Sequence, residues 1–321
     1  MAVYTEVDDD DLIAFCADYE LGDVLACKGI AEGVENTNYL LTMESGSYIL
    51  TLYEKRVDHK DLPFFLGLMK HLAQAGVPCP HPIVARDGVA LRELAGRPCV
   101  IISFLAGMSP KKIKAYHCGE LGRALGDFHL GTAEFDQTRE NSLSVESWRE
   151  LLESSGTGAN SLRSGFYDEL EQELTFLETS WPTDLPGGVI HADLFPDNVF
   201  FRGEHLSGLI DFYFACNDSY AYDLGICINA WCFEPDGSFN ITKAQHFLME
   251  YRNIRDVTDE EMAALPILAR GSAMRFLLTR LYDWINTPPD ALVVRKDPME
   301  YWNKLKFHKA VSSPAEYGLG F

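Results

Sequence analysis

Residues 189–201 read VIHADLFPDNVFF, and residues 209–212 read LIDF. The first stretch contains the pattern H-x-D-x-x-x-x-N, with His191, Asp193 and Asn198 at the three fixed positions. Apolar residues on both sides predict a strand, a loop and a second strand. The pattern alone also fits an ordinary structural turn, so its context decides between the two interpretations. We assign His191 to orienting the loop backbone rather than to proton transfer.

The chain after this loop is expected to fold back on it. Pro196 turns the loop, residues 202–204 turn a hairpin, and the returning strand leads to Asp211. Mg²⁺ prefers oxygen ligands, and it takes only one or two of them from a protein when phosphates and water supply the rest. Asn198 and Asp211 suit this role. Asp193 is then free to accept a hydrogen bond from a substrate hydroxyl. This arrangement predicts phosphoryl transfer.

The rest of the chain divides into a strand-rich part and a helical part. Residues 1–104 contain short apolar or alternating runs and one helical segment over residues 61–75. From residue 105 onward the periodicity is mostly helical, apart from a strand-rich island. We therefore predict an α+β fold with two domains, residues 1–104 and 105–321, and a ligand bound between them. The predicted strands are 24–31, 38–43, 48–53, 89–94 and 99–105; the island is 188–211; the later helices are 116–132, 145–154, 166–179, 220–231, 242–252 and 259–284.

Composition argues against several kinds of partner. The 321 residues include 27 basic and 48 acidic ones, and the formal net charge of −21 repels nucleic acids and anionic membrane surfaces. The apolar runs are too short to cross a bilayer, and the acidic start lacks the features of a signal peptide. We expect a cytoplasmic protein whose partner is a small molecule. The eight cysteines form no C-x-x-C pair and are interpreted as free, buried thiols.

The loop and the I-D-F segment resemble a known superfamily. Residues 191–198 are similar to the catalytic loop of the aminoglycoside phosphotransferases and choline kinases, which are small-molecule relatives of the protein kinases, and residues 210–212 resemble their metal-binding motif. The chain lacks the arginine before Asp193 and the A-P-E segment of protein kinases. The resemblance implies a bilobal protein-kinase-like fold. Its small antiparallel-sheet lobe would bind ATP with Mg²⁺, and its larger, mainly helical lobe would carry catalysis and the substrate.

Six segments carry a narrower resemblance: residues 33–39, 48–56, 62–65, 191–198, 275–276 and 280–283. Through them, the chain resembles the bacterial type II homoserine kinases within the superfamily. This resemblance implies ATP-dependent phosphorylation of the hydroxyl of L-homoserine to O-phospho-L-homoserine, a step in threonine biosynthesis. Two alternatives stay open: a kinase of another hydroxyl compound, such as choline, an aminoglycoside or methylthioribose, and a pseudokinase that binds a nucleotide without turnover.

Two segments are candidates for nucleotide binding. The loop before the second predicted strand lies where a kinase-like fold covers the phosphates, and Gly33 and Asn36 are its candidate contacts. Taken alone, this loop fits a plain hairpin turn, because it is poor in glycine. The strand that ends near residue 105 offers the backbone of Ser103, Phe104 and Leu105 to adenine. The alternative is that Phe104 and Leu105 are core residues.

A kinase is expected to pair a lysine on the third strand with a glutamate on the following helix. Here Thr51 falls at the lysine position, and Phe64 or Phe65 falls where the glutamate would be. Lys28, on the neighbouring strand, is a conceivable substitute for the lysine. The other explanation is a greater reliance on magnesium and backbone donors.

Homoserine carries an ammonium and a carboxylate, so its site needs both an acid and a base. Asp223, Arg275 and Arg280 are the candidates. The arginines are five residues apart on one predicted helix and diverge by about 140°, so they need not share a site. Asp223 also matches a superfamily position that holds the catalytic loop, which makes a structural role the alternative. His129 is interpreted as a packing residue of its helix.

Overall fold

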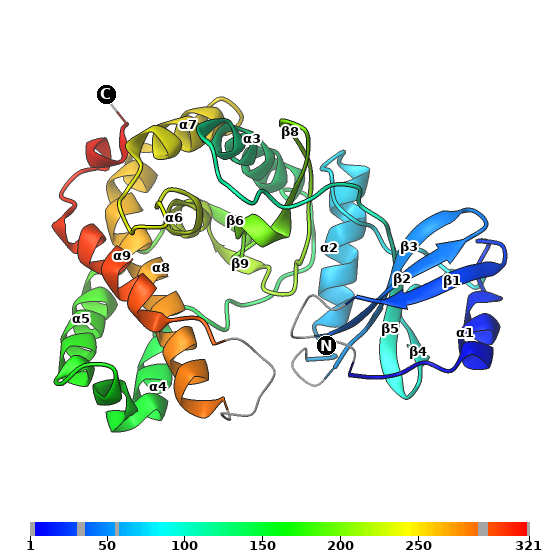
Figure 1. Ribbon diagram of the computed structural model, residues 1–321. Coiled ribbons are helices and arrows are strands. Elements are labelled where there is room, and N and C mark those ends of the chain that lie inside the picture. Colours follow the sequence, from blue (N-terminus) through cyan, green and yellow to red (C-terminus); the bar gives the residue numbers. More distant parts are fainter. Residues whose placement is uncertain (1–3, 31–35, 55–57, 288–294, 320–321) are drawn as a thin grey trace. The chain divides into compact units, whose positions relative to one another are not determined.

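The computed structural model describes residues 4–30, 36–54, 58–287 and 295–319 (Figure 1). The chain forms two compact units. Unit 1 holds the residues up to Gly107, and two later segments, Glu134–Gln137 and Ser207–Tyr213, also belong to it. Unit 2 holds the rest of the chain from Met108 onward. The loop at residues 191–198 therefore lies in unit 2, whereas the I-D-F segment lies in unit 1.

Unit 1 is built on a five-stranded antiparallel sheet of the order β1-β2-β3-β5-β4. Burial alternates strictly along the interior strand β2, as expected for a sheet with one face in a core. On that face, Leu41 and Leu50 pack against Phe15 of the first helix, and this cluster forms the core of the sheet. The elements are α1 (Asp9–Cys16), β1 (Val24–Gly29), β2 (Thr37–Met43), β3 (Gly46–Leu52), α2 (Leu62–Gln74), β4 (Arg92–Leu94) and β5 (Arg97–Ser103).

Unit 2 is mainly helical and carries two short β-ladders. One pairs β6 with β9 in antiparallel register, and the other is the β7–β8 hairpin, whose strand β8 passes into unit 1 at Ser207. Helices α3 and α7 pack closely because Gly122 has no side chain: a Cβ there would lie 2.2 Å from the carbonyl oxygen of Phe247. The elements are α3 (Ala115–Gly131), α4 (Val145–Ser155), α5 (Phe166–Ser180), β6 (Gly187–Ile190), β7 (Val199–Arg202), β8 (His205–Leu209), β9 (Cys216–Ser219), α6 (Tyr220–Trp231), α7 (Ile241–Arg252), α8 (Asp259–Asn286) and α9 (Pro298–Ala310).

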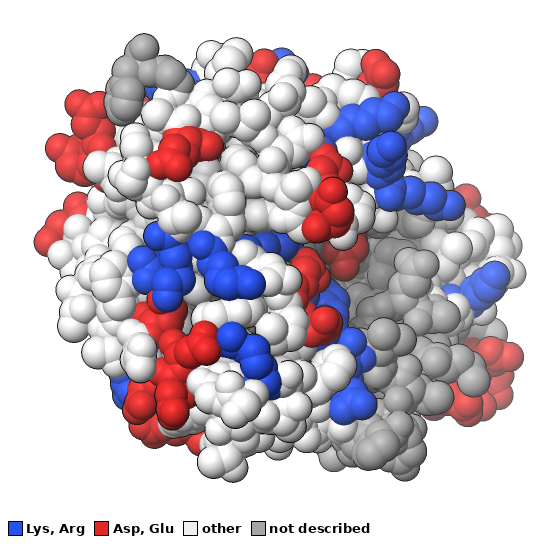
Figure 2. Space-filling model, turned by 60° about the vertical axis from the view of Figure 1, so that its left-hand side comes forward, with Lys and Arg blue, Asp and Glu red and all other residues white. Residues whose placement is uncertain are grey.

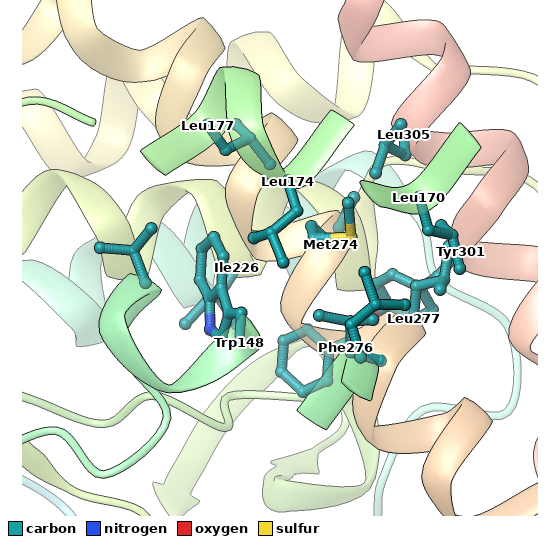
Figure 3. Packing of buried hydrophobic residues seen from close by; sticks show 14 of the residues in the cluster. Trp148, Leu170, Leu174, Leu177, Ile226, Met274, Phe276, Leu277, Tyr301 and Leu305 are labelled. Carbon is teal, nitrogen blue, oxygen red and sulfur yellow. The ribbon is translucent and has the colours of Figure 1, made fainter. Parts of the chain in front are cut away.

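The core of unit 2 lies where α4, α5, α6, α8 and α9 meet (Figure 3). Trp148, Ile226, Leu277 and Tyr301 come from four of these helices and are fully buried. Burying one such apolar side chain contributes about 1.5–3 kcal/mol. The same cluster includes Ile190, the last residue of β6, so the start of the candidate catalytic loop rests on this core.

The structure confirms the predicted α+β class and every helix predicted after residue 105, with α6 matching residues 220–231. Two elements of unit 2 escaped the sequence analysis. In α9, the buried positions include Lys304 and His308, so the helix lacks a clear apolar period. In β9, three of the four residues, CNDS, are polar. All eight cysteines are free, and seven of them are buried.

The surface is uneven in charge. Figure 2 shows lysine and arginine side chains gathered beside acidic ones on one face, although acidic residues predominate in the chain as a whole. Local recognition therefore depends on the side chains at each site rather than on the net charge. In the described parts of the chain, no helix is long and apolar enough to span a membrane.

His308 of α9 gives the fold an acid-sensitive point. Its Nδ1 lies 2.7 Å from the hydroxyl of Tyr317, and its Nε2 lies 3.0 Å from the side-chain oxygen of Asn229. Burial lowers the pKa of His308 from 6.5 to about 3. The unfolded chain therefore binds a proton between these two pH values that the folded chain does not bind. The free energy of unfolding must fall as the pH drops through this range.

We expect His308→Gln to remove this part of the acid sensitivity. Between pH 8 and pH 5, protonation of His308 in the unfolded chain lowers the free energy of unfolding by about 2 kcal/mol. Urea unfolding at the two pH values should therefore show a smaller loss of stability in the variant than in the parent protein. His205→Gln is the control, because the His205 side chain is 88% exposed. Equal losses in the parent and in His308→Gln would contradict this assignment.

Candidate active site

The loop that follows β6 begins beside a fully buried carboxylate. Asp223, in the first turn of α6, accepts a hydrogen bond from the backbone amide of His191 at 2.8 Å and another from that of Ala192 at 3.0 Å. Each bond uses a different carboxylate oxygen, and no part of Asp223 is exposed. Asp223 thus fixes the two residues immediately before Asp193.

Ala192 has a backbone conformation that residues other than glycine rarely adopt. Its φ is +61°, in the left-handed region, which costs about 1–2 kcal/mol. The carbonyl oxygen of Ala192 accepts a hydrogen bond from Nη1 of Arg275 on α8, while its amide is held by Asp223. We call Asp223, Ala192 and Arg275 the Ala192 clamp. Because the clamp fixes both peptide groups of Ala192, it sets the direction in which Asp193 leaves the backbone.

Asn198 fixes the carboxylate of Asp193 from the other end of the loop. Its Nδ2 donates to the carbonyl oxygen of Asp193 at 2.8 Å and to the carboxylate Oδ2 at 3.2 Å. Between them, the carbonyl oxygen of Leu194 accepts a hydrogen bond from the indole of Trp231 at 2.8 Å. Asp193 itself is half-buried. The structure therefore brings together Asp193 and Asn198, with the carboxylate held in place and still partly accessible.

A chain of buried polar groups supports Asp223. Nε2 of His129 lies 3.3 Å from Asp223, and Nδ1 of the same ring lies 2.7 Å from the hydroxyl of Tyr251. Burial lowers the pKa of His129 and keeps its imidazole neutral. Burial alone would raise the pKa of Asp223, but the hydrogen bonds from His129 and from the backbone amide of His191 hold it below its usual value. Asp223 therefore stays ionised, and His129 supports it rather than merely filling space.

Asn198 has an oxygen that suits a hard cation. Its Nδ2 is used by Asp193, whereas its Oδ1 receives no hydrogen bond from the described residues. Amide oxygens are ordinary ligands of Mg²⁺ and Ca²⁺. Within the described ranges, no three His, Cys, Asp or Glu side chains form a metal-binding group. A cation at Asn198 would therefore draw most of its ligands from phosphates and water.

Asp211 lies in unit 1, two residues beyond the end of β8, with a φ of +66°. The segment that carries it packs on its own unit: Tyr213 contacts the rings of Tyr53 and Phe65 edge-on, each at 5.6 Å between ring centroids. The Tyr213 hydroxyl also donates to that of Tyr53 at 3.3 Å. The role of Asp211 as a metal ligand stays a prediction from the sequence.

No lysine–glutamate pair stands at the positions where a kinase would have one. The Thr51 hydroxyl donates to Oδ1 of Asn38 on β2 at 2.8 Å, which satisfies it without a cation. Phe64 and Phe65 of α2 are both buried, with their rings 5.7 Å apart. Lys28 is exposed on β1. Aromatic packing thus replaces the expected ion pair, and the substitution of Lys28 for the strand lysine stays a prediction.

The predicted nucleotide contacts of the first loop are only partly described. Gly33 lies outside the described residues. Asn36 is buried, and its side-chain oxygen accepts a hydrogen bond from the backbone amide of Glu54 at 3.3 Å. This hydrogen bond ties the start of β2 to the end of β3, so Asn36 has a structural contact besides any contact with phosphate.

At the end of β5, the three residues predicted to contact adenine have different surroundings. The backbone amide of Ser103 donates a hydrogen bond to the carbonyl oxygen of His81 at 2.9 Å. The Ser103 hydroxyl accepts a hydrogen bond from the backbone amide of His81 at 3.0 Å. The Ser103 amide and hydroxyl are therefore used by a neighbouring segment, and a backbone contact of Ser103, Phe104 or Leu105 with adenine stays a prediction. Phe104 is 48% exposed, which rules out the interpretation of Phe104 as a core residue, and Leu105 is half-buried.

The three predicted substrate contacts have different surroundings. A direct substrate contact by Asp223 is wrong, because both of its oxygens bind the loop inside the core. Arg275 is 3% exposed and belongs to the same clamp. Arg280 donates to a carboxylate oxygen of Glu300 at 2.7 Å and to the carbonyl oxygen of Asp297 at 3.2 Å.

Sequence reasoning missed the strained Ala192 and the Trp231 hydrogen bond. A left-handed alanine leaves no signal in the sequence, because alanine is common in every element. Trp231 reads as one more apolar residue of a buried helix. The role of Asp223 in holding the catalytic loop could be predicted only from the resemblance to kinases, where it was the alternative to substrate binding.

The chain belongs to the phosphotransferase enzyme family, whose model matches residues 26–260. It is 59% identical to a homoserine kinase of Rhodospirillum rubrum over 319 residues, which cover 99% of each chain. It is also 60% identical to a homoserine kinase of Rhizobium meliloti over 319 residues, which cover 99% of this chain and 98% of the relative. The likeness is therefore not confined to the catalytic loop.

Solved structures share the fold. An amicoumacin kinase in complex with AMP-PNP and Ca²⁺ aligns with a TM-score of 0.68 at 18% identity, covering 94% of this chain and 93% of that one. An ethanolamine kinase of Plasmodium vivax aligns with a TM-score of 0.62 at 16% identity, covering 88% and 82%. These likenesses confirm the fold predicted from the resemblance to small-molecule kinases.

Proposed function

We propose that this protein transfers the γ-phosphoryl group of ATP to the hydroxyl of L-homoserine, giving O-phospho-L-homoserine and ADP. The observation that carries the proposal is the 59% identity to a homoserine kinase along nearly the whole of both chains. The clamped loop supports the same reaction, because phosphoryl transfer needs a carboxylate held in one direction to aim the hydroxyl. An inactive scaffold has no need of that precision.

In this proposal Asp193 is the catalytic residue. Its carboxylate accepts a hydrogen bond from the substrate hydroxyl and takes up the proton as the new oxygen–phosphorus bond forms. Asn198 holds that carboxylate and offers its free amide oxygen to Mg²⁺, with Asp211 as the second protein ligand. When bound, Mg²⁺ would neutralise charge on the phosphate oxygens. Asp223 and Arg275 are positioning residues that act through Ala192.

A cytoplasmic location and a free small-molecule substrate complete the proposal. ATP and amino acids are available in the cytoplasm, and the net charge of −21 disfavours nucleic acids as partners. The proposal places the protein in threonine biosynthesis through its product.

The test is ADP release from magnesium-ATP over a panel of hydroxyl compounds: L-homoserine, L-threonine, L-serine, choline, methylthioribose and kanamycin. We expect turnover that is selective for L-homoserine and that stops when EDTA removes the metal. Selective turnover of choline, methylthioribose or kanamycin would keep the phosphotransferase and overturn the substrate. Magnesium-dependent nucleotide binding without turnover of any compound would favour the pseudokinase alternative.

A further inference from the structure

Beside the catalytic loop, three aromatic rings from separate elements form a continuous cluster. Phe195 of the loop lies edge-on to Phe276 of α8, with 4.9 Å between ring centroids, and Phe276 lies 5.3 Å from Tyr301 of α9. Figure 3 labels Phe276 and Tyr301 in the buried core of unit 2. We call these three residues the aromatic cluster. Phe195 follows Asp193 by two residues, and its amide donates to the Asp193 carbonyl oxygen at 2.8 Å, so the cluster begins in the loop that carries Asp193.

Four cations lie over the rings of this cluster. Lys296 lies 5.5 Å from the centroid of Phe195, Arg275 lies 4.3 Å from that of Phe276, and both Arg280 and Lys304 lie 4.4 Å from that of Tyr301. Among the residues that the structure describes, the carboxylate of Glu300 is the only one that forms ion pairs with them. This local excess of positive charge stands out in a chain whose net charge is −21.

The ion pairs separate the four cations into two groups. Arg280 and Lys304 both bind Glu300, at 2.7 and 2.6 Å. Arg275 donates to the carbonyl oxygen of Ala192, and its Nε receives no partner among the described residues. Lys296 has no ion pair with any described residue, and it is exposed. Lys296 is therefore the cation most available to an anion from solution.

The aromatic cluster also contains a buried donor without a partner. The Tyr301 hydroxyl is buried and forms no hydrogen bond with any residue that the structure describes. Leaving such a group unsatisfied costs about 1–3 kcal/mol, so a buried hydroxyl of this kind needs a ligand or a water molecule to explain it. Tyr19 also has a buried hydroxyl without a partner among the described residues, but it lies in the core of unit 1 and none of the four cations lies over its ring.

We propose that Lys296 and the Tyr301 hydroxyl bind the carboxylate of the amino-acid substrate, with the aromatic cluster as the wall against which its carbon chain packs. This inference rests on the proposed function. Lys296 supplies the charge, Tyr301 supplies a directed hydrogen bond, and the remaining positive charge repels the substrate ammonium. The substrate is thereby oriented with its carboxylate toward the cluster and its hydroxyl toward Asp193.

The sharpest test compares L-homoserine with 3-amino-1-propanol, which is the same molecule without its carboxylate. Lys296→Met keeps the length of the side chain and removes its charge. We expect the KM for L-homoserine to rise about 10- to 100-fold, with kcat changed less than twofold, because a hydrogen bond to a charged group is worth about 1.5–3 kcal/mol. The kcat/KM for 3-amino-1-propanol should stay within twofold of the parent value.

Tyr301→Phe tests the second contact without changing the packing. We expect the KM for L-homoserine to rise about 5- to 10-fold, again with no effect on 3-amino-1-propanol. Two matched controls should leave both substrates unaffected. Lys306→Met removes an exposed lysine of α9, and Tyr19→Phe removes another buried hydroxyl that has no partner among the described residues.

Three results would overturn the inference. The first is an unchanged KM for L-homoserine in both variants, and the second is an equal loss with the two substrates. The third is a raised KM for magnesium-ATP, which would assign the cations to nucleotide phosphates. If the parent protein itself turns over no L-homoserine, the proposed function fails and the inference falls with it. Normal parent turnover with unaffected variants would refute this inference alone.

Discussion

Asp193→Asn is expected to lower kcat for L-homoserine by about 10²- to 10⁴-fold while the protein stays folded. Asparagine keeps the size of the side chain and cannot take up the hydroxyl proton. Asp193 is half-buried, and Asn198 donates to its carboxylate, so the substitution changes one polar contact rather than the core. The measurement is steady-state kcat, with urea unfolding to confirm that the variant remains cooperative.

The matched control for this substitution is Asp197→Asn. Asp197 lies in the same loop and is exposed, and the change removes the same charge. We expect kcat of the control to stay within about twofold of the parent value, as for a surface change without a defined contact. Near-normal turnover by purified Asp193→Asn would remove Asp193 from the catalytic role.

Asp223→Asn is the second substitution with a large expected effect. An asparagine side chain has one oxygen instead of two, so it leaves one of the His191 and Ala192 amides without its acceptor. We expect a loss of about 3 kcal/mol in the free energy of unfolding. We also expect kcat to fall about 100-fold, because small misplacements of a catalytic group have large effects on rate.

Both quantities can be measured at 10 °C, where a weakened variant is still folded. Asp218→Asn is the control, since Asp218 is a partly buried carboxylate of β9 that binds Asn141 rather than the loop. It should leave kcat close to that of the parent protein. If Asp223→Asn lowered stability but kept the parent kcat, the Ala192 clamp would be a structural support without influence on the reaction.

Local sequence patterns predict much of this fold. The helices of unit 2 follow from apolar residues at helical spacing, and the strands of unit 1 follow from alternation bounded by turns. The loop at residues 191–198 was recognisable because the reaction needs fixed residue types at fixed spacings. Asp193 and Asn198 therefore appear together in the sequence and in the structure.

The missed features depend on contacts between distant segments. Arg275 reaches Ala192 across 83 residues of sequence, and nothing near either residue signals the contact. Helix α9 escaped because polar residues occupy its buried positions: Lys304 is paired with Glu300 within the helix, and His308 is held by Asn229, which only the fold brings near. Lys296 and Tyr301 were missed for the same reason, since the aromatic cluster forms only when α8, α9 and the loop come together.

The central claim is that the protein attaches a phosphoryl group to the hydroxyl of L-homoserine. The most direct measurement is ³¹P NMR of the reaction of L-homoserine with magnesium-ATP, with Asp193→Asn as the blank. We expect a phosphate monoester resonance coupled to the protons of the carbon that carried the hydroxyl, absent from the blank. Inorganic phosphate without a monoester, or a monoester that forms equally with Asp193→Asn, would contradict the account.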